Sequence, residues 1–577
     1  MSLHLDQQCQ RATKTDASAN PFFSGRPWRL VFAIRFSNRV GHRCGDTHLG
    51  GPPLTVKYFL QLSYTPTQKP RFSANLNLPA SHRHVANQPM ATPLTPPSGG
   101  ESFASQVRSA VIWRSGTQVA AQLVQWASTF LVIRILAPSD YGLFAMTGVV
   151  MAFLNMLNGY GLASGLVREE AVSDRQIRQA FGMLIAVNVG LGVIQFGLAP
   201  VAATYYRQPE VADLLRVQSL IYLFTPFIAL PQALLSRRMD YRRQGRVNIL
   251  ASVVGAGTAL VGALAGWGVW TLVIAPMALF AARAIGMTIA AGSLMMPCFD
   301  FRGAGSLARF GGVMAASQLF WFAQSQVDVF IAGRRLDLHD LGIYTTSLFL
   351  AQIFVSKFVP PLNEVAFSAY ARIQHDRAAT AAAFVKGVRI VMLAALPFYF
   401  GLAVTAESMV RVMLGEQWAD AAFVVQLLAL AMPFMTLQVL FSPACDALGR
   451  PGVGVSNGAI GSVILTAGFL IGIQWGLIGI AAAWVVCYPI YLAISCWRSL
   501  PVIGARGGDV AAAIAPPLTA AAVMAIVVAG LDHALTLAPL PRLVLLVTVG
   551  GAVYAGWLAI FAKQLVRETL ALVRNRV

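Results

Sequence analysis

The chain has 577 residues, of which 56% are apolar and only 12% are charged, and its formal net charge is +19. Soluble domains carry roughly 25% charged residues, so this composition excludes a string of soluble domains and indicates a polytopic membrane protein. Long apolar runs recur from Val111 onward. About 20 helical residues span a hydrocarbon core of ~30 Å. The runs lack the alternation of membrane β-strands, which excludes an outer-membrane barrel.

The excess of Lys and Arg does not require a nucleic-acid partner. Basic residues collect in the cytoplasmic loops of membrane proteins, and no interleaving of aromatic and basic residues marks a base-stacking surface. We therefore expect no nucleic acid among the partners. The six cysteines include no CxxC pair, which favours small buried apolar residues over disulfides or metal ligands.

Residues 1–105 differ in kind from the rest of the chain. They are rich in Arg, His, Gln, Ser and Pro and contain no apolar run long enough for a signal peptide. This composition predicts a disordered tail. Met90 opens a short segment just before the first apolar run, so we expect residues 1–89 to be either a translation-start artefact or an unstructured tail. The segment from His42 to His48, which also holds Cys44 and Asp46, matches no familiar metal site in its spacing, and we expect no metal.

The remaining residues predict an all-α membrane protein with fourteen transmembrane helices. We expect an N-terminal six-helix bundle within residues 106–300, a C-terminal six-helix bundle within residues 301–500, and two extra helices with a cytoplasmic tail within residues 501–577. The expected helices span residues 111–136, 142–163, 179–203, 212–235, 247–266, 268–291, 307–333, 341–366, 384–411, 421–446, 454–475, 477–498, 510–530 and 542–563.

Short segments of the first predicted bundle recur in the second. The polar bend Ser139-Asp140-Tyr141-Gly142 leads into the second helix, and His339-Asp340-Leu341-Gly342 leads into the eighth 200 positions later. The pair Trp267-Gly268 likewise recurs as Trp475-Gly476, 208 positions later. A nearly constant long offset predicts a duplicated unit. Because each unit has an even number of spans, the two are expected to be parallel repeats with a central cleft between them.

The basic residues predict the orientation in the membrane. Loops after even-numbered helices hold most of the arginines, whereas the loop at residues 407–420, after an odd-numbered helix, is net acidic. By the positive-inside rule, both termini are expected in the cytoplasm.

Two segments resemble a known family. Leu136-Ala137-Pro138-Ser139-Asp140-Tyr141-Gly142 resembles the end of the first helix in polysaccharide-type (Wzx-like) flippases of the multidrug/oligosaccharidyl-lipid/polysaccharide exporter superfamily. Asp328-Val329-Phe330-Ile331-Ala332-Gly333 resembles the seventh-helix signature of that family. The resemblance covers about residues 105–500 and implies a V-shaped pair of bundles in a bacterial inner membrane. It also implies that undecaprenyl-diphosphate-linked oligosaccharides, such as O-antigen, capsule or exopolysaccharide units, are flipped from the cytoplasmic to the periplasmic leaflet by alternating access.

Charged side chains within the predicted helices are the candidate phosphate-binding groups, because a charge in the bilayer interior is costly. These cations are Arg114, Arg283 and Lys357. A diphosphate head group needs such cations, and arginine matches phosphate oxygens in two-pronged geometry. The alternative is that these side chains reach out to the cytoplasmic interface.

Polar residues near these cations complete the predicted site. Gln118 and Gln122 continue a polar stripe on the first helix, and Asn155 is a candidate ligand for sugar hydroxyls or a hydrogen bond between helices. Asp328 and Glu364 are candidate cleft acids. Asp328 is expected either to exchange a proton or a sodium ion during transport or to anchor one helix to another.

The expected partners are the lipid bilayer and a polyprenyl-diphosphate-linked glycan, with a polysaccharide polymerase and co-polymerase as further candidates. No cofactor or catalytic group is expected, since the sequence has no phosphate-cradling GxxxxGK[ST] motif and no catalytic constellation. Three alternatives stay open: an ion-coupled multidrug exporter, a lipid II flippase of the same superfamily, and a membrane polysaccharide polymerase or ligase. The last is expected to carry a long periplasmic loop, and the odd-numbered loops are short.

Overall fold

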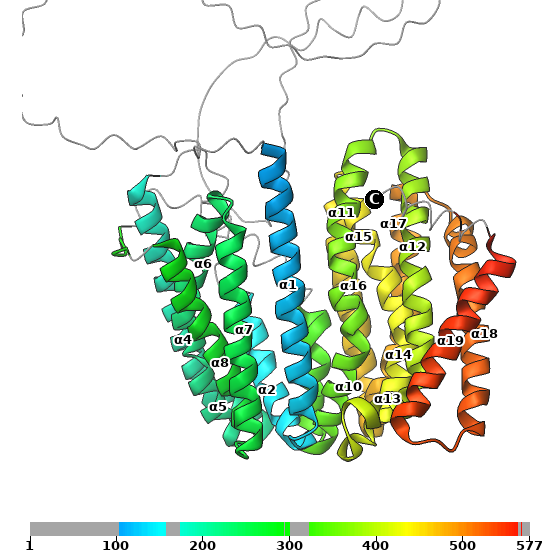
Figure 1. Ribbon diagram of the computed structural model, residues 1–577, viewed down its shortest axis with the longest axis horizontal. Helices are drawn as coiled ribbons and strands as arrows, with labels where there is room; N and C mark the ends of the chain where they lie inside the picture. The colour runs from blue at the N-terminus through cyan, green and yellow to red at the C-terminus, as the bar shows by residue number, and fades with distance from the viewer. Residues whose placement is uncertain (1–102, 157–172, 293–294, 301–321, 564–566, 568–577) are drawn as a thin grey trace, which may run out of the picture. The chain divides into compact units, whose positions relative to one another are not determined.

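The computed structural model describes residues 103–156, 173–292, 295–300, 322–563 and 567 (Figure 1). All of them belong to one of the two units of the chain, Pro89–Val577. The expected tail therefore lies outside the described residues, apart from its last three positions. Within the described part, the chain consists of helices joined by short connections, with no strand.

The N-terminal helices are α1 (Phe103–Ile133), α2 (Pro138–Asn155), α4 (Asp174–Tyr206), α5 (Glu210–Gln218), α6 (Ile221–Arg237), α7 (Tyr241–Leu264) and α8 (Val269–Ala291). A helical segment at residues 322–335 opens the C-terminal part. It is followed by α10 (Leu338–Lys357), α11 (Val359–Ile373), α12 (Arg377–Val404), α13 (Ala406–Met413), η1 (Glu416–Trp418), α14 (Ala421–Val439), α15 (Phe441–Ala447), α16 (Pro451–Gly472), η2 (Ile473–Trp475), α17 (Gly476–Ile503), α18 (Gly507–Ala534) and α19 (Pro539–Phe561).

Ten segments of the described residues are long and apolar enough to cross a membrane. One of them, Pro451–Ile503, contains both α16 and α17, whereas α1, α2 and residues 322–335 are outside this set. The prediction of an all-helical, multi-pass membrane protein is thus confirmed. The count of fourteen spans stays a prediction.

Several predicted helices are broken in the structure. The one expected at residues 212–235 begins inside α5 and is interrupted at Ser219 and Leu220, and the one expected at residues 384–411 is interrupted at Thr405. These breaks escape sequence analysis because apolar residues continue on both sides and no proline or glycine marks them. The break expected beside Lys357 is confirmed, with α11 starting at Val359.

The recurring Trp-Gly pair adopts the same backbone in both parts of the chain. Gly268, before α8, has φ 54° and ψ −134°, and Gly476, at the start of α17, has φ 66° and ψ −147°. A positive φ with such a ψ is accessible almost only to glycine. The recurrence therefore preserves a turn that no other residue type would adopt without strain.

The recurring bends also lie against each other, where α2 and α10 pack together (Figure 1). A Cβ atom on Gly142 would collide with the carbonyl group of Leu338, and a Cβ atom on Gly342 would collide with the carbonyl group of Pro138. Leu338 follows Pro138 by the same 200 positions that separate the two glycines. The contact is therefore reciprocal, and only glycine permits so close an approach of the two helices.

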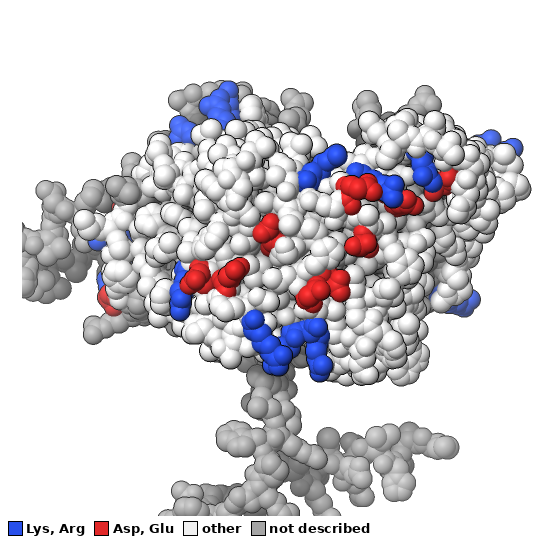
Figure 2. Space-filling model, turned by 90° about the horizontal axis from the view of Figure 1, so that it is seen from below, with Lys and Arg blue, Asp and Glu red and all other residues white. Residues whose placement is uncertain are grey.

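Charged side chains mark the ends of the helices. The connections from α1 to α2, from α7 to α8 and from α18 to α19 lie at the lower end in Figure 1. Seen from that end, Figure 2 shows acidic side chains spread across the middle of the face, with Lys and Arg side chains beside them and toward its edges. We call this end of the molecule, where these three connections lie, the acid-rich end. Two of the ion pairs lie within short helices: Arg216 pairs with Asp213 at 2.9 Å in α5, and Arg411 pairs with Glu407 at 3.2 Å in α13.

Candidate functional site

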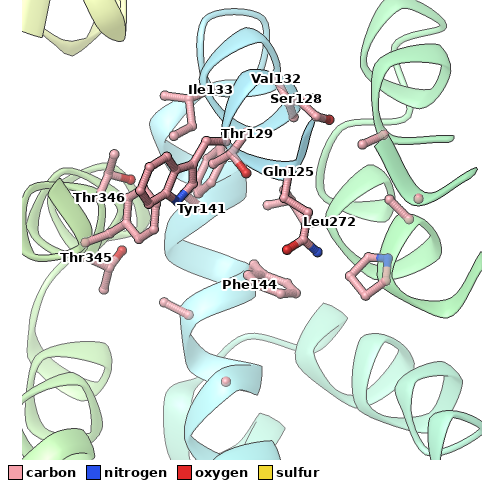
Figure 3. A pocket seen from close by; sticks show the side chains of 18 of the residues that line it. Gln125, Ser128, Thr129, Val132, Ile133, Tyr141, Phe144, Leu272, Thr345 and Thr346 are labelled. Carbon is pink, nitrogen blue, oxygen red and sulfur yellow. The ribbon is translucent and has the colours of Figure 1, made fainter. Parts of the chain in front are cut away.

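A cavity of about 710 Å³ lies between the N-terminal and the C-terminal helices. Its walls come from α1, α2, α7 and α8 on one side and from residues 322–335 and α10 on the other. Figure 3 shows Gln125 projecting into this space beside Phe144, with Thr345 and Thr346 on the α10 side. The polar lining side chains are Gln122, Gln125, Ser128, Thr129, Tyr141, Thr271, Ser325, Gln326, Thr345, Thr346, Gln352 and Lys357.

Lys357 is the one charged side chain among the described residues that line this first cavity. It ends α10 and is exposed. The last turn of a helix carries partial negative charge, which favours a cation at this place. The end of α10 thus brings an exposed ammonium group to a cavity whose other described lining residues are uncharged.

The described residues that line a second cavity, of about 390 Å³, all belong to the N-terminal helices α1, α6, α7 and α8. It shares Gln122, Gln125 and Leu279 with the first cavity, so the two adjoin. Polar side chains dominate its lining: Thr117, Gln118, Gln122, Gln125, Gln232, Ser236, Tyr241, Gln244, Asn248, Ser252 and Arg283.

Arg283 supplies the positive charge of the second cavity. Its Nη2 donates a hydrogen bond to Oε1 of Gln232 across 3.2 Å. Nε2 of Gln244 donates to the backbone carbonyl of Gln232 at 3.1 Å and to Oγ of Ser236 at 3.0 Å. These bonds tie α6, α7 and α8 together and hold the guanidinium group toward α6.

The structure brings four of the predicted site residues to these adjoining cavities. Lys357 lines the first cavity, Gln118 and Arg283 line the second, and Gln122 lines both. Arg114 belongs to α1, but its side chain lies outside the described residues.

Asn155 and Glu364 line neither cavity. Gly148 is the last α2 residue that lines the first cavity, and Asn155 ends α2 about two turns further on. Asn155 therefore lies on the same face of α2 but beyond the cavity. Glu364 is exposed on α11, beyond the break that separates α11 from the cavity-lining α10. The roles predicted for these two side chains stay predictions.

Asp328 is buried, with 1% of its surface exposed, and it faces away from the cavity that Ser325 and Val329 line. The hydroxyl group of Tyr344 donates to Oδ2 of Asp328 at 2.7 Å, and the indole N–H of Trp484 donates to that hydroxyl oxygen at 2.8 Å. The chain of bonds joins residues 322–335 to α10 and α17. This geometry corresponds to the predicted helix anchor, and the role in ion exchange stays a prediction.

Contacts between the two groups of helices lie next to Ile133, which lines the first cavity. Nη1 of Arg134 donates to the carbonyl oxygen of Val412 at 2.8 Å. In return, Nε2 of Gln417 donates to the carbonyl oxygens of Arg134 and Leu136, each at 3.0 Å. The indole N–H of Trp418 donates to the carbonyl oxygen of Ile133. We call these contacts together the closed end.

A family model described as "Polysaccharide biosynthesis protein" matches residues 131–423, just over half of the chain. The chain belongs to this family. The matched range contains Arg283, Asp328 and Lys357 and most of the walls of the first cavity. The predicted resemblance to polysaccharide-type flippases is thereby confirmed.

This polysaccharide biosynthesis protein is also similar to individual proteins of known name. It is 27% identical over 360 residues to the succinoglycan biosynthesis transport protein ExoT of Rhizobium meliloti (strain 1021), covering 62% of this chain and 72% of the relative. It is 22% identical over 344 residues to the teichuronic acid biosynthesis protein TuaB of Bacillus subtilis (strain 168), covering 59% and 71%. The solved structure of the lipid II flippase MurJ, in an inward closed conformation, matches with a TM-score of 0.64 and 13% identity, covering 79% of this chain and 100% of that one. At this identity the likeness shows the fold alone.

Sequence reasoning missed several amide side chains that line the second cavity. Gln232 interrupts an apolar stretch of α6, and Gln244 and Asn248 are spaced by four on α7. The spacing of four places two side chains on one helix face. This signal was hidden because the predicted helix began only at residue 247.

Proposed function

We propose that this protein moves a polyprenyl-diphosphate-linked oligosaccharide, such as an O-antigen, capsule or exopolysaccharide unit, from the cytoplasmic to the periplasmic leaflet of a bacterial inner membrane. The observation that carries the proposal is the pair of adjoining cavities, the second of them lined mainly by polar side chains, whose charged lining side chains, among the described residues, are cations only. An anionic head group needs such a path through hydrocarbon, and its prenyl chain stays in the lipid. Family membership and the transport role named for ExoT support the proposal.

We propose an architecture of fourteen spans, with two parallel six-helix bundles in residues 106–300 and 301–500 around a V-shaped cleft, and two further helices in residues 501–577. The reciprocal contact of Gly142 with Gly342 supports a duplication, as does the shared backbone of Gly268 and Gly476. Two such bundles open the cleft to one side of the membrane at a time when one rocks against the other.

The acid-rich end of the molecule is proposed to face the periplasm, which places both termini in the cytoplasm. The closed end belongs to that side, because Arg134 lies in the connection from α1 to α2 and Gln417 donates to its carbonyl oxygen. In this state the cavity is closed toward the periplasm. Release of substrate on that side requires the contacts between α1 and residues 412–418 to separate.

Lys357 and Arg283 are proposed to attract the diphosphate from opposite groups of helices, with Arg114 as a third candidate. Gradients of H⁺ or Na⁺ are the proposed energy source, with Asp328 as the acid that takes up the ion. A polysaccharide polymerase and its co-polymerase are the proposed consumers of the flipped glycan.

The alternatives fit the cavities less well. A multidrug exporter that carries cationic drugs favours acidic side chains, and no carboxylate lines either cavity among the described residues. A lipid II flippase needs the same cations as the proposed activity, so the substrate decides between these two. A polymerase or ligase is disfavoured by the family, whose named relative ExoT is a transport protein.

The test is a flipping assay on the purified protein in liposomes. A fluorescent prenyl-diphosphate-linked sugar is supplied, and dithionite quenching from outside reports the fraction that has changed leaflet. We expect Lys357→Gln and Arg283→Gln each to slow flipping at least about ten-fold, which corresponds to loss of one charge-assisted hydrogen bond. Lys357→Arg keeps most of the rate.

The matched control is Lys386→Gln, which removes an exposed lysine of α12 that lines neither cavity. It should flip at the wild-type rate. Wild-type flipping by the double variant Lys357→Gln/Arg283→Gln would rule out the proposed path for the diphosphate.

A further inference from the structure

We propose that the second cavity is a sugar-binding subsite, in which carboxamide side chains of the N-terminal helices hold the hydroxyl groups of a neutral sugar of the glycan. This inference rests on the proposed function, because it assumes that a lipid-linked glycan enters the first cavity. It assigns a division of roles: the carboxamides of the N-terminal helices read the sugar, and the cations Lys357 and Arg283 hold the diphosphate.

The chemistry of the lining carries the proposal. Six carboxamides line the cavity: Gln118, Gln122, Gln125, Gln232, Gln244 and Asn248. Each carboxamide presents a donor group and an acceptor group in one plane, which matches a pair of neighbouring hydroxyl groups on a pyranose ring. No carboxylate and one cation, Arg283, are found among the described lining residues, so the cavity suits neutral sugars better than cationic amino sugars.

One buried amide oxygen in the wall of the cavity lacks a hydrogen-bond donor among the described residues. Oδ1 of Asn248 is buried and accepts no hydrogen bond from the described part of the chain. A buried acceptor without a donor is costly by about 1–3 kcal/mol, so a ligand hydroxyl that donates to it would relieve that cost. The amides of Gln232 and Gln244 are meanwhile fixed by their bonds to Arg283 and Ser236, which holds the cavity wall in place before a ligand arrives.

Position and size also fit a sugar. The volume of about 390 Å³ lies within the range of roughly 300–1,000 Å³ that is usual for small-molecule sites. Gln122 and Gln125 belong to both cavities, so a sugar in the second remains next to a diphosphate in the first. Because the second cavity lies within one group of helices, rocking of the two groups leaves its shape intact. The sugar would travel with the N-terminal helices.

The experiment measures binding of defined probes to the full chain in lipid nanodiscs. The probes are farnesyl diphosphate and farnesyl diphosphate carrying one glucose, galactose or N-acetylglucosamine. We expect at least one sugar-bearing probe to bind about ten-fold more tightly than farnesyl diphosphate, as one or two net hydrogen bonds would give. The variant Gln118→Leu/Asn248→Leu should lose this gain and keep the wild-type affinity for farnesyl diphosphate, which also shows that it is folded.

The matched control is Gln326→Leu, which removes a carboxamide from the first cavity only. It should keep the gain. Equal binding of all probes by the wild type, or a gain that survives Gln118→Leu/Asn248→Leu, would overturn the subsite while leaving the proposed function standing. A wild-type protein that binds no prenyl diphosphate would overturn both. Because Gln118 is exposed, the single variant Gln118→Leu keeps the test available if Asn248→Leu does not fold.

Discussion

Trp418 donates its indole N–H to the carbonyl oxygen of Ile133 across 2.9 Å and so joins residues 285 positions apart in the chain. Its side chain is buried, and its ring meets that of Tyr141 edge-on at 5.5 Å between centroids. Ile133 ends α1, and the carbonyl groups of a last helical turn have no partner within the helix. A side chain of the C-terminal helices thus caps a helix of the N-terminal group.

Replacement of Trp418 by Phe should loosen the closed end, because it keeps an aromatic ring but removes the N–H donor. A hydrogen bond of this kind contributes about 1 kcal/mol, so the open population should rise about five-fold. The measurement is the rate at which a cysteine in the cavity wall, Thr129→Cys, reacts with a membrane-impermeant thiol reagent from the acid-rich side. It is made in a background without the native cysteines.

The control for this variant is Trp484→Phe. It also removes a buried indole hydrogen bond, the one to Tyr344 at 2.8 Å, but within the C-terminal helices. Its labelling rate should equal that of the parent. If both variants accelerate labelling equally, the effect is general loosening and Trp418 does not hold the closed end.

Gly342→Ala should destabilise the crossing of α2 and α10, since the new methyl group would overlap the carbonyl group of Pro138. Backbone cannot rotate aside as a side chain can, so we expect a loss of about 1–3 kcal/mol in the free energy of unfolding. Thermal unfolding of the detergent-solubilised protein measures the change.

Gly257→Ala serves as the matched substitution. Gly257 also lies within a helix, α7, but a Cβ atom there meets no atom within 4 Å. Alanine has the higher helix propensity by up to about 1 kcal/mol, so this variant should be as stable as wild type or more so. Equal losses at the two glycines would show that the close approach of α2 and α10 does not set the stability.

Sequence analysis located the recurring bends and glycines because they are local and rest on residue type. Gly142 and Gly342 each follow an aspartate by two positions, and the pair Trp475-Gly476 repeats Trp267-Gly268. The cations Arg283 and Lys357 were found for a similar reason, since a charge within an apolar run is conspicuous.

The partners of these residues were not predictable. Trp418 and Gln417 look like ordinary interface residues in a short loop, and only the fold brings them to the end of α1. The separation of Asp328 from the cavity likewise depends on which way one helix is turned. That rotation is decided by Tyr344 and Trp484, which stand 16 and 156 positions further along the chain.

The bond between Tyr344 and Asp328 should be measurable as a coupling energy. Tyr344→Phe leaves the buried carboxylate oxygen without its donor, and we expect a loss of about 1–3 kcal/mol in the free energy of unfolding. Asp328→Ala removes the acceptor. Because the two changes break the same bond, the double variant should lose at least about 0.5 kcal/mol less than the sum of the single losses.

A second double-mutant cycle is the control for the pair of Tyr344 and Asp328. Tyr491 is also a buried tyrosine with a hydrogen-bond partner, since Nε2 of Gln438 donates to its hydroxyl oxygen at 2.7 Å. Combining Tyr491→Phe with Asp328→Ala should give additive losses. Additive losses in the Tyr344 cycle instead would mean that the bond does not contribute to stability, and the anchor would have to be sought elsewhere.

The last two helices should depend on an ion pair between their facing ends. Nε of Arg542, in α19, lies 2.7 Å from Oδ1 of Asp532, in α18, and Nη2 of Arg542 donates to the backbone carbonyl of Asp532 at 2.9 Å. The two side chains are only 24% and 18% exposed, so water screens them poorly. Arg542→Gln should therefore lower the free energy of unfolding by about 1–3 kcal/mol.

An exposed pair provides the comparison: Arg216 and Asp213 are 42% and 64% exposed. Arg216→Gln should lower the free energy of unfolding by less than about 0.5 kcal/mol. Thermal unfolding at low and at high salt measures both, and only the effect of Arg216→Gln should vanish at high salt. A loss at Arg542 that disappears with salt would show that its pair behaves as a surface pair and does not hold α18 to α19.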